Sequence, residues 1–157
     1  MDLEVKIQSS NEKFHINLVI NWLIQIADAI NFLHTKEPKP IIHRDIKPKN
    51  IFITFQGLLK LGDFGVSKYS QNLVESEQTF VGTDGYKAPE IILWKNYNKS
   101  IDIWAFACVI YMCIEKEKAF PPEKLKQLIS LYSRKDQSDY IPKLSLSDKK
   151  LNQLYQK

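Results

Sequence analysis

The amino-acid sequence predicts an α+β fold in a single domain, mostly helical with a small β-hairpin, and three features of its 157 residues support this prediction. Apolar residues recur every three or four positions across residues 18–33, which is typical of an amphipathic helix. Two short β-type runs lie within residues 51–62 and are separated by a turn signal. Residues 101–114 are apolar almost throughout, which indicates a helix buried inside a core.

The first helix is expected to end near Thr35, because the two prolines of KEPKP (36–40) remove backbone donors and clash with the preceding turn. The β-type runs are IFITF (51–55) and LLKLG (58–62). Gln56-Gly57 joins them, and a glycine in so short a connection is typical of a hairpin.

Polar residues without periodicity follow the hairpin at 69–80 and predict a mobile loop. After the buried helix, Pro121-Pro122 predicts the start of another helix over about 123–132. A last helix is expected to begin at Ser147 and run to the C-terminus. The order is therefore a helix, a hairpin, a loop and then several helices.

Composition excludes several classes of protein. An apolar content of 44% is too high for a disordered chain, and five glycines exclude a collagen-like one. No run approaches the roughly 18 uninterrupted apolar residues of a membrane span, and the N-terminus lacks the pattern of a signal peptide. We therefore expect an intracellular protein of the cytoplasm, with the nucleus as an open alternative, and no membrane partner.

Charge and cysteine usage agree with this expectation. The net charge is +4, and the basic residues are mixed with acids and carry no nucleic-acid-binding motif, so no nucleic-acid partner is expected. Cys108 and Cys113 lie five positions apart in the apolar helix. That spacing predicts reduced, structural cysteines.

Three linear motifs carry the chemistry: IIHRDIKPKNIFI (41–53), LGDFG (61–65) and VGTDGYKAPE (81–90). With the apolar DIWAFACV that follows, they make the sequence resemble the C-terminal lobe of eukaryotic protein kinases from about Asp2 to the end of the chain. Order and spacing also match, because Asn50 follows Asp45 by five positions. The resemblance implies a protein-kinase-like fold of the serine/threonine type, with ATP and Mg²⁺ as cofactors and a protein as substrate.

The resemblance also implies a role for each motif residue. Asp45 accepts or orients the proton of the substrate hydroxyl, and Lys47 steadies the γ-phosphate. Asn50 and Asp63 supply the hard oxygen ligands that a phosphate-bridging metal needs. Lys47 and Thr83, which is expected to bond to Asp45 and Lys47, together indicate Ser/Thr specificity. The resemblance thus names catalytic residues (Asp45, Lys47, Asn50), nucleotide-binding residues (Lys47, Asn50, Phe52, Asp63) and metal ligands (Asn50, Asp63).

Other residues are expected to be structural. His43 could be mistaken for a base, but it is expected to pack near Phe64. Phe52 is expected in the core, where it could form the floor under an adenine ring. Asp102 is a charge inside an apolar helix, so it is expected to bond the backbone of the catalytic loop. Three further aromatic residues are expected to serve packing alone: Trp94, Trp104 and Tyr97.

Regulation can also be inferred from the loop. Arg44, Lys68, Thr79 and Thr83 form the expected regulatory set. We hypothesise that phosphorylated Thr79 pairs with Arg44 and Lys68 and so orders the loop. An unmodified Thr79 remains the alternative, and two serines are weaker candidates: Ser70 and Ser76.

Several fragments resemble the NIMA-related kinases in particular. They are DLEVKI, NWLIQIADAINFLH, HRDIKPKNIF, TFVGT and YNKSIDIWAFACVIYMC. The resemblance implies a partial kinase domain over residues 1–157, from the segment after the hinge to the second-last helix, with the N-terminal lobe absent. The sequence contains no GxGxxG loop and no V-A-I-K strand, and the late arginine that usually pairs with the position of Glu90 is absent.

Two interpretations follow from this partial match. The chain is either an incomplete copy of an active serine/threonine kinase or a catalytically inactive binding or regulatory module. The intact Asp45, Lys47, Asn50 and Asp63 favour the first interpretation. The apolar floor of the nucleotide cleft would be exposed in either case, so it could bind other proteins, and the isolated chain is expected to turn over ATP extremely slowly.

Overall fold

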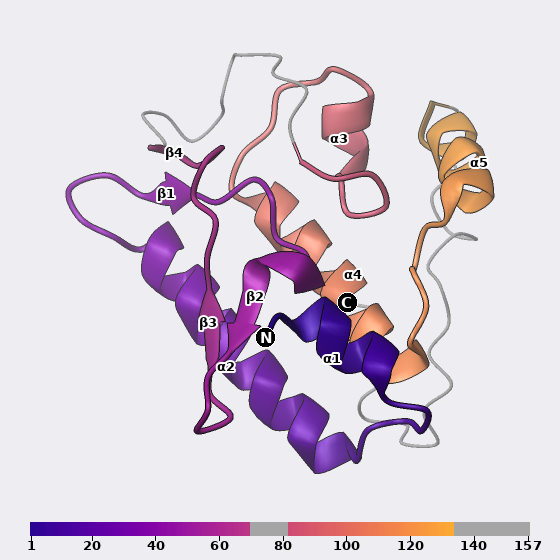
Figure 1. The fold of residues 1–157 in the computed structure, drawn as a ribbon. Helices are drawn as coiled ribbons and strands as arrows, with labels where there is room; N and C mark the ends of the chain where they lie inside the picture. The colour runs from indigo at the N-terminus through magenta and orange to yellow at the C-terminus, as the bar shows by residue number, and fades with distance from the viewer. Residues whose placement is uncertain (70–81, 134–157) are drawn as a thin grey trace.

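The computed structural model describes residues 1–69 and 82–133. Within them, the chain mixes helices with two small sheets (Figure 1). The helices are α1 (Leu3–Ser9), α2 (Ile16–His34), α3 (Pro89–Ile92), α4 (Ser100–Glu115), α5 (Pro122–Ser133) and the 3₁₀ turn η1 (Pro48–Asn50). The strands are β1 (Ile41–Ile42), β2 (Ile51–Ile53), β3 (Leu59–Leu61) and β4 (Lys68–Tyr69).

The predicted hairpin is confirmed, with strands shorter than the β-type runs. Strands β2 and β3 pair antiparallel with Ile51 opposite Leu61. The turn contains Gly57 at a φ of 78°, a conformation that glycine adopts without a steric penalty. A second ladder, in which β1 pairs antiparallel with β4, was not predicted; it places Tyr69 in a strand rather than in the expected loop.

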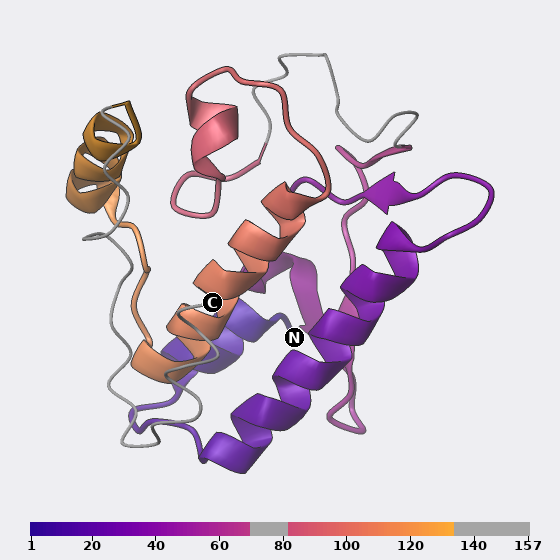
Figure 2. The same ribbon diagram turned by 180° about the vertical axis from the view of Figure 1, so that it is seen from behind.

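Helix α2 confirms the predicted amphipathic helix. It begins after His15, whose side chain accepts a hydrogen bond from the backbone N–H of Asn17, and it ends at Thr35 as expected. Its buried apolar residues recur at spacings of three or four along one face: Val19, Trp22, Ile26, Ile30 and Leu33. This face packs on α4 and β3, and α2 and α4 lie side by side in both views (Figures 1 and 2).

Among the described residues, α2 alone has the length and mean hydropathy, 1.4, that a membrane span requires. One such helix is weak evidence, because the core helix of a soluble protein has the same properties. The apolar face of α2 belongs to the core. The absence of a membrane partner therefore stays a prediction.

Helix α4 is the predicted buried helix. Nine of its residues are buried, including both cysteines, which are free thiols as predicted. Helix α5 likewise begins at the predicted proline pair. The expected loop residues from 70 onward and the expected helix from Ser147 lie outside the described residues.

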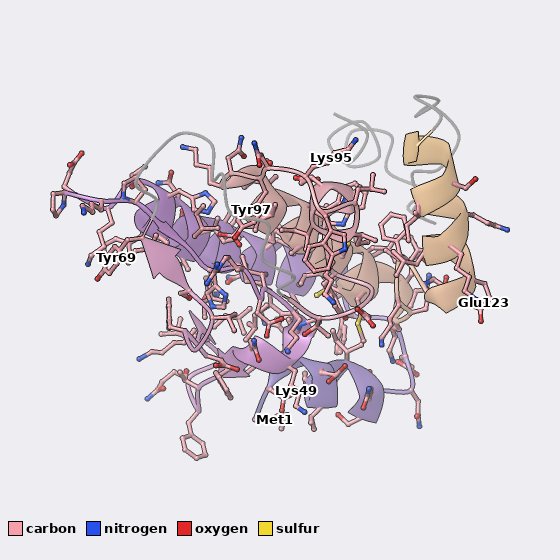
Figure 3. The ribbon with its side chains drawn as sticks, turned by 90° about the horizontal axis from the view of Figure 1, so that it is seen from above. Met1, Lys49, Tyr69, Lys95, Tyr97 and Glu123 are labelled. Atoms are coloured by element: carbon pink, nitrogen blue, oxygen red, sulfur yellow. The ribbon has the colours of Figure 1, made fainter. Side chains whose placement is uncertain are left out.

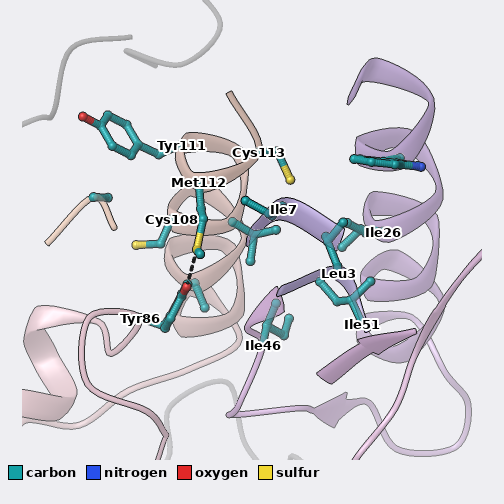
Figure 4. Close-up of a cluster of buried hydrophobic side chains, with 14 of the residues drawn as sticks. Leu3, Ile7, Ile26, Ile46, Ile51, Tyr86, Cys108, Tyr111, Met112 and Cys113 are labelled. Atoms are coloured by element: carbon teal, nitrogen blue, oxygen red, sulfur yellow. Dashed lines mark hydrogen bonds between the residues drawn. The ribbon is translucent and has the colours of Figure 1, made fainter. Parts of the chain in front are cut away.

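The main core forms where α1, α2, η1, β2 and α4 meet (Figure 4). Helix α1 was not predicted, although Asp2 accepts a hydrogen bond from the Val5 backbone N–H and so marks its start. Its Leu3 and Ile7 are at most 1% exposed. The N-terminal segment thereby becomes part of the platform beneath η1 and β2.

Candidate active site

A sharp backbone bend carries His43, Arg44 and Asp45 out of β1. Arg44 has a φ of 69°, in the left-handed region that costs an L-residue about 1–2 kcal/mol. The carboxylate of Asp102 accepts the backbone N–H groups of His43 and Arg44, each at 2.9 Å. Asp102 is 1% exposed in the first turn of α4. The predicted anchor is confirmed, and it holds the bend in its strained conformation.

His34 joins the same carboxylate and was missed in the sequence. Its Nε2 lies 2.8 Å from Oδ2 of Asp102, and both side chains are buried. Because a carboxylate that already accepts backbone donors can only accept, Nε2 carries the proton of this bond. A polar residue in register with Ile30 on the apolar face of α2 was the available signal.

His43 has the predicted structural role. Its ring lies 4.9 Å from that of Phe64 and its Nε2 is 3.0 Å from the carbonyl oxygen of Gly62. The residue is 0% exposed, and this burial lowers the pKa of the His43 ring below its usual value. A neutral, buried ring packs the catalytic loop against the turn that carries Asp63.

Four predicted residues meet in one hydrogen-bonded cluster. Lys47 donates to Asp45 Oδ2 at 2.8 Å and to the Thr83 hydroxyl at 2.6 Å, and Thr83 donates to Asp45 Oδ1 at 2.7 Å. Asn50 donates from Nδ2 to Asp45 Oδ2 at 3.0 Å and to the Asp45 carbonyl at 2.9 Å. Thr83 therefore contacts both Asp45 and Lys47, as predicted.

The cluster keeps Asp45 ionised. Partial burial raises the pKa of its carboxyl group, but the hydrogen bonds from Lys47, Thr83 and Asn50 and the positive charge of Lys47 outweigh this effect. The resulting pKa of Asp45 lies below its usual value. Near neutral pH, Asp45 is thus a carboxylate next to an ammonium group, with part of its surface open to solvent.

Asn50 and Asp63 fit a magnesium ion. Asn50 uses both amide protons on Asp45, which leaves its Oδ1 available as a hard oxygen ligand. A backbone bond from Gly62 N to Asn50 O, 2.9 Å long, ties the two segments together just before Asp63. Asp63 is exposed with a φ of 59°. Within the described residues no three His, Cys, Asp or Glu side chains form a metal cluster, and Mg²⁺ needs few protein ligands when phosphates and waters supply the rest.

Phe52 is not in the core, contrary to the prediction. It is 46% exposed, because successive strand residues face opposite sides and Ile51 takes the inward position in β2. The Phe52 ring covers Gly62, where an added Cβ would lie 2.8 Å from the ring. An exposed aromatic face next to the Asn50 and Asp63 segments remains compatible with binding a planar base.

A small pocket borders Asp45 and Thr83 on the side of residues 82–88. Its wall includes Tyr86, whose hydroxyl donates to the sulfur of Met112 at 2.9 Å (Figure 4). At the pocket, Gly82 has a φ of 88°, and an added Cβ would lie 2.9 Å from the Arg44 carbonyl oxygen. The backbone at position 82 therefore approaches the catalytic loop as only glycine permits.

The expected regulatory residues are only partly described. Arg44 donates from Nε to the Val66 carbonyl at 2.5 Å and from Nη1 to the Tyr97 hydroxyl at 3.1 Å. The Lys68 side chain and all of Thr79 lie outside the described part of the chain, as do the weaker serine candidates. The phosphorylation hypothesis therefore stays a prediction.

The expected packing residues behave differently from one another. Tyr97 is 2% exposed and lies in the interior of Figure 3, but its hydroxyl also serves Arg44. Trp104 stacks on Phe120 with ring centroids 5.3 Å apart. Trp94 is 52% exposed, so the prediction of a packing role for it was wrong: the loop after α3 turns its ring outward at a φ of 54°.

Comparison with known proteins adds the family context. The family described as "Protein kinase domain" matches residues 2–157. Serine/threonine-protein kinase Nek1 of Mus musculus is 39% identical over 116 residues, which are 74% of this chain and 9% of that protein. Nek3 of Mus musculus is 37% identical over 124 residues, 78% of this chain and 23% of that protein. Serine/threonine-protein kinase nekl-2 of Caenorhabditis elegans is 35% identical over 135 residues, 85% of this chain and 37% of that protein. The chain thus spans well under half the length of these relatives.

Proposed function

The chain belongs to the protein kinase domain family, and on that premise we propose that it transfers the γ-phosphoryl group of ATP to serine and threonine hydroxyls of proteins, as part of a NIMA-related kinase. The names of its relatives support the acceptor class. The observation that carries the proposal is the bonded cluster of Asp45, Lys47, Thr83 and Asn50.

The cluster suits phosphoryl transfer because this reaction needs positioning and charge stabilisation more than covalent catalysis. The lowered pKa of Asp45 makes it a carboxylate that orients the substrate hydroxyl and accepts its proton as the new P–O bond forms. The bond between the β- and γ-phosphates breaks in the same exchange, and ADP leaves with the electron pair. Asp45 borders a pocket in which an acceptor residue can approach.

Lys47 and Thr83 hold that carboxylate from two sides. Lys47 uses two of its three ammonium protons on Asp45 and Thr83, which leaves one to stabilise a γ-phosphate oxygen. Asn50 and Asp63 would hold Mg²⁺, which neutralises charge on the phosphates when it is bound. Phe52 offers its exposed ring to the adenine base.

A second candidate function rests on exposed apolar side chains. Phe52, Phe55, Leu58, Phe64 and Val66 are between 38% and 109% exposed, and they lie on the hairpin or just after it. Such side chains favour contact with another polypeptide surface. A binding or regulatory module without catalysis is therefore the alternative.

The test uses the whole product of the gene that encodes this chain, purified through an affinity tag. Phosphate transfer from γ-labelled ATP is measured on peptide pools that contain Ser, Thr or Tyr as the sole acceptor. We expect Mg²⁺-dependent labelling of the Ser and Thr pools and a loss of about 100-fold or more for Asp45→Asn and for Asp63→Asn. Asp28→Asn, an exposed substitution on α2, is the matched control and should keep full activity.

Labelling that survives both active-site substitutions would overturn the assignment of the site. Labelling of the Tyr pool alone would overturn the acceptor class. No labelling by a folded wild-type product that still captures a partner through the exposed apolar residues would replace catalysis with the binding function.

A further inference from the structure

We propose that His34 is a positioning residue for phosphoryl transfer: it fixes the orientation of the Asp102 carboxylate, which in turn fixes the backbone that presents Asp45. The inference rests on the proposed function, because its effect on rate presupposes phosphoryl transfer. His34 touches neither substrate nor nucleotide in this proposal. It acts through Asp102 alone.

The geometry forms a continuous chain of short contacts. His34 Nε2 lies 2.8 Å from Asp102 Oδ2. The same Oδ2 accepts the backbone N–H of His43 at 2.9 Å, and Oδ1 accepts that of Arg44 at 2.9 Å. The next residue along the chain is Asp45. His34 is thus two hydrogen bonds away from the residue adjoining the proposed proton acceptor.

The third donor matters because two backbone donors leave the carboxylate some freedom. Its terminal torsion is broad and nearly two-fold, so Asp102 could rotate or exchange its oxygens. A hydrogen bond from His34 in a fixed direction selects one rotation of the carboxylate plane. That rotation supports the left-handed conformation of Arg44, whose φ is 69°.

His34 also closes a loop of the chain on Asp102. It ends α2, and His43 lies nine positions later, after the proline-containing connection and β1. Both ends of this excursion bond to the same oxygen of Asp102. Because Asp102 is in the first turn of α4, which packs on α2, the two helices set the height of the catalytic loop together.

Three variants separate positioning from ordinary packing. His34→Leu keeps most of the apolar volume but removes the donor. His34→Gln restores an N–H donor on a side chain of similar reach. Leu33→Ala is the matched control: Leu33 is 7% exposed, neighbours His34 in α2 and belongs to the core. It lowers stability through a cavity without removing a hydrogen bond from Asp102.

The experiment measures kcat and KM of each variant in the whole gene product, well below its unfolding temperature. Amide exchange at His43 and Arg44 is measured in parallel on the 157-residue chain. For His34→Leu we expect kcat to fall about 10- to 100-fold, as for a small misplacement of a reacting group, with KM values within about twofold. Exchange at both amides should quicken at least about tenfold, because an opened Asp102 releases their protons.

His34→Gln should recover kcat to within about threefold of the wild type, and Leu33→Ala should leave kcat nearly unchanged despite its lower stability. The proposal fails if His34→Leu keeps kcat within about twofold, or if Leu33→Ala lowers kcat as much. The exchange arm separates the two proposals. In a protein without phosphotransfer, faster exchange in His34→Leu still supports the positioning role, and unchanged exchange overturns it.

Discussion

Replacing Asp102 with alanine is expected to be among the most destabilising single changes in the chain. The carboxylate accepts three hydrogen bonds, from His34 Nε2 and from the backbone N–H groups of His43 and Arg44, at 2.8–2.9 Å. Its residue is 1% exposed, so water does not reach the donors that alanine would leave. Removing the carboxylate therefore leaves three donors without an acceptor.

The magnitude follows from that count. Each buried donor left unsatisfied costs about 1–3 kcal/mol, and neighbouring losses are not additive. Removing the buried charge also relieves its own desolvation cost, which offsets part of the loss. We expect the free energy of unfolding to fall by about 3–5 kcal/mol, a large share of the roughly 5–15 kcal/mol that a domain has.

The assay is urea unfolding of the 157-residue chain, followed by circular dichroism at pH 7. Asp102→Asn serves as a milder variant if the alanine variant does not fold. Its remaining oxygen can still accept one of the backbone donors, so its loss should be smaller by about 1–2 kcal/mol. Asp28→Ala, exposed on α2, should change stability by less than about 0.5 kcal/mol. A loss below about 1 kcal/mol for Asp102→Ala would refute the argument that this carboxylate anchors the loop.

Three further predictions concern protonation. Lys47→Met removes a hydrogen bond and a positive charge from Asp45, so carbon-detected NMR should show a higher pKa for Asp45 than in the wild type; an unchanged pKa would contradict the cluster. Because burial lowers the pKa of His43, its ring should titrate below 6.5, and the stability that it contributes should be complete above pH 6.5 and lost as the pH falls through the folded pKa. NMR titration at or above 6.5 would show that the ring is not desolvated. Burial raises the pKa of Cys108 and of Cys113 to about 12, so neither thiol should react with iodoacetamide at pH 8 until urea is added, and prompt native labelling would place them outside the core.

Local patterns in the sequence were sufficient for most of the elements. The period of α2 and the continuous apolar run of α4 predicted both central helices, because helix faces repeat every three to four residues. Gln56-Gly57 between β-type runs predicted the hairpin. Helix α1 and the β1–β4 ladder were missed, since a helix of seven residues and strands of two are too short for periodicity to show.

The linear motifs were equally sufficient for the composition of the cluster around Asp45. Asp45, Lys47 and Asn50 fall within six consecutive positions, so the loop and η1 bring them together almost unaided. Thr83 required the resemblance to a known family, because it lies 38 positions from Asp45. The direction of Phe52 was available from strand alternation and was misread as core.

The sequence by itself therefore determined the main helices, the hairpin and the identity of the residues that gather around Asp45. Only the tertiary structure decided how that loop is held. His34, His43 and Arg44 reach Asp102 across 58–68 positions, and Tyr97 reaches Arg44 across 53. Element type depends on sterics and capping within a few residues, whereas these bonds exist only because α2 and α4 pack side by side. A buried polar side chain on an apolar helix face signals that a partner exists, but the packing of the whole chain decides which partner it meets.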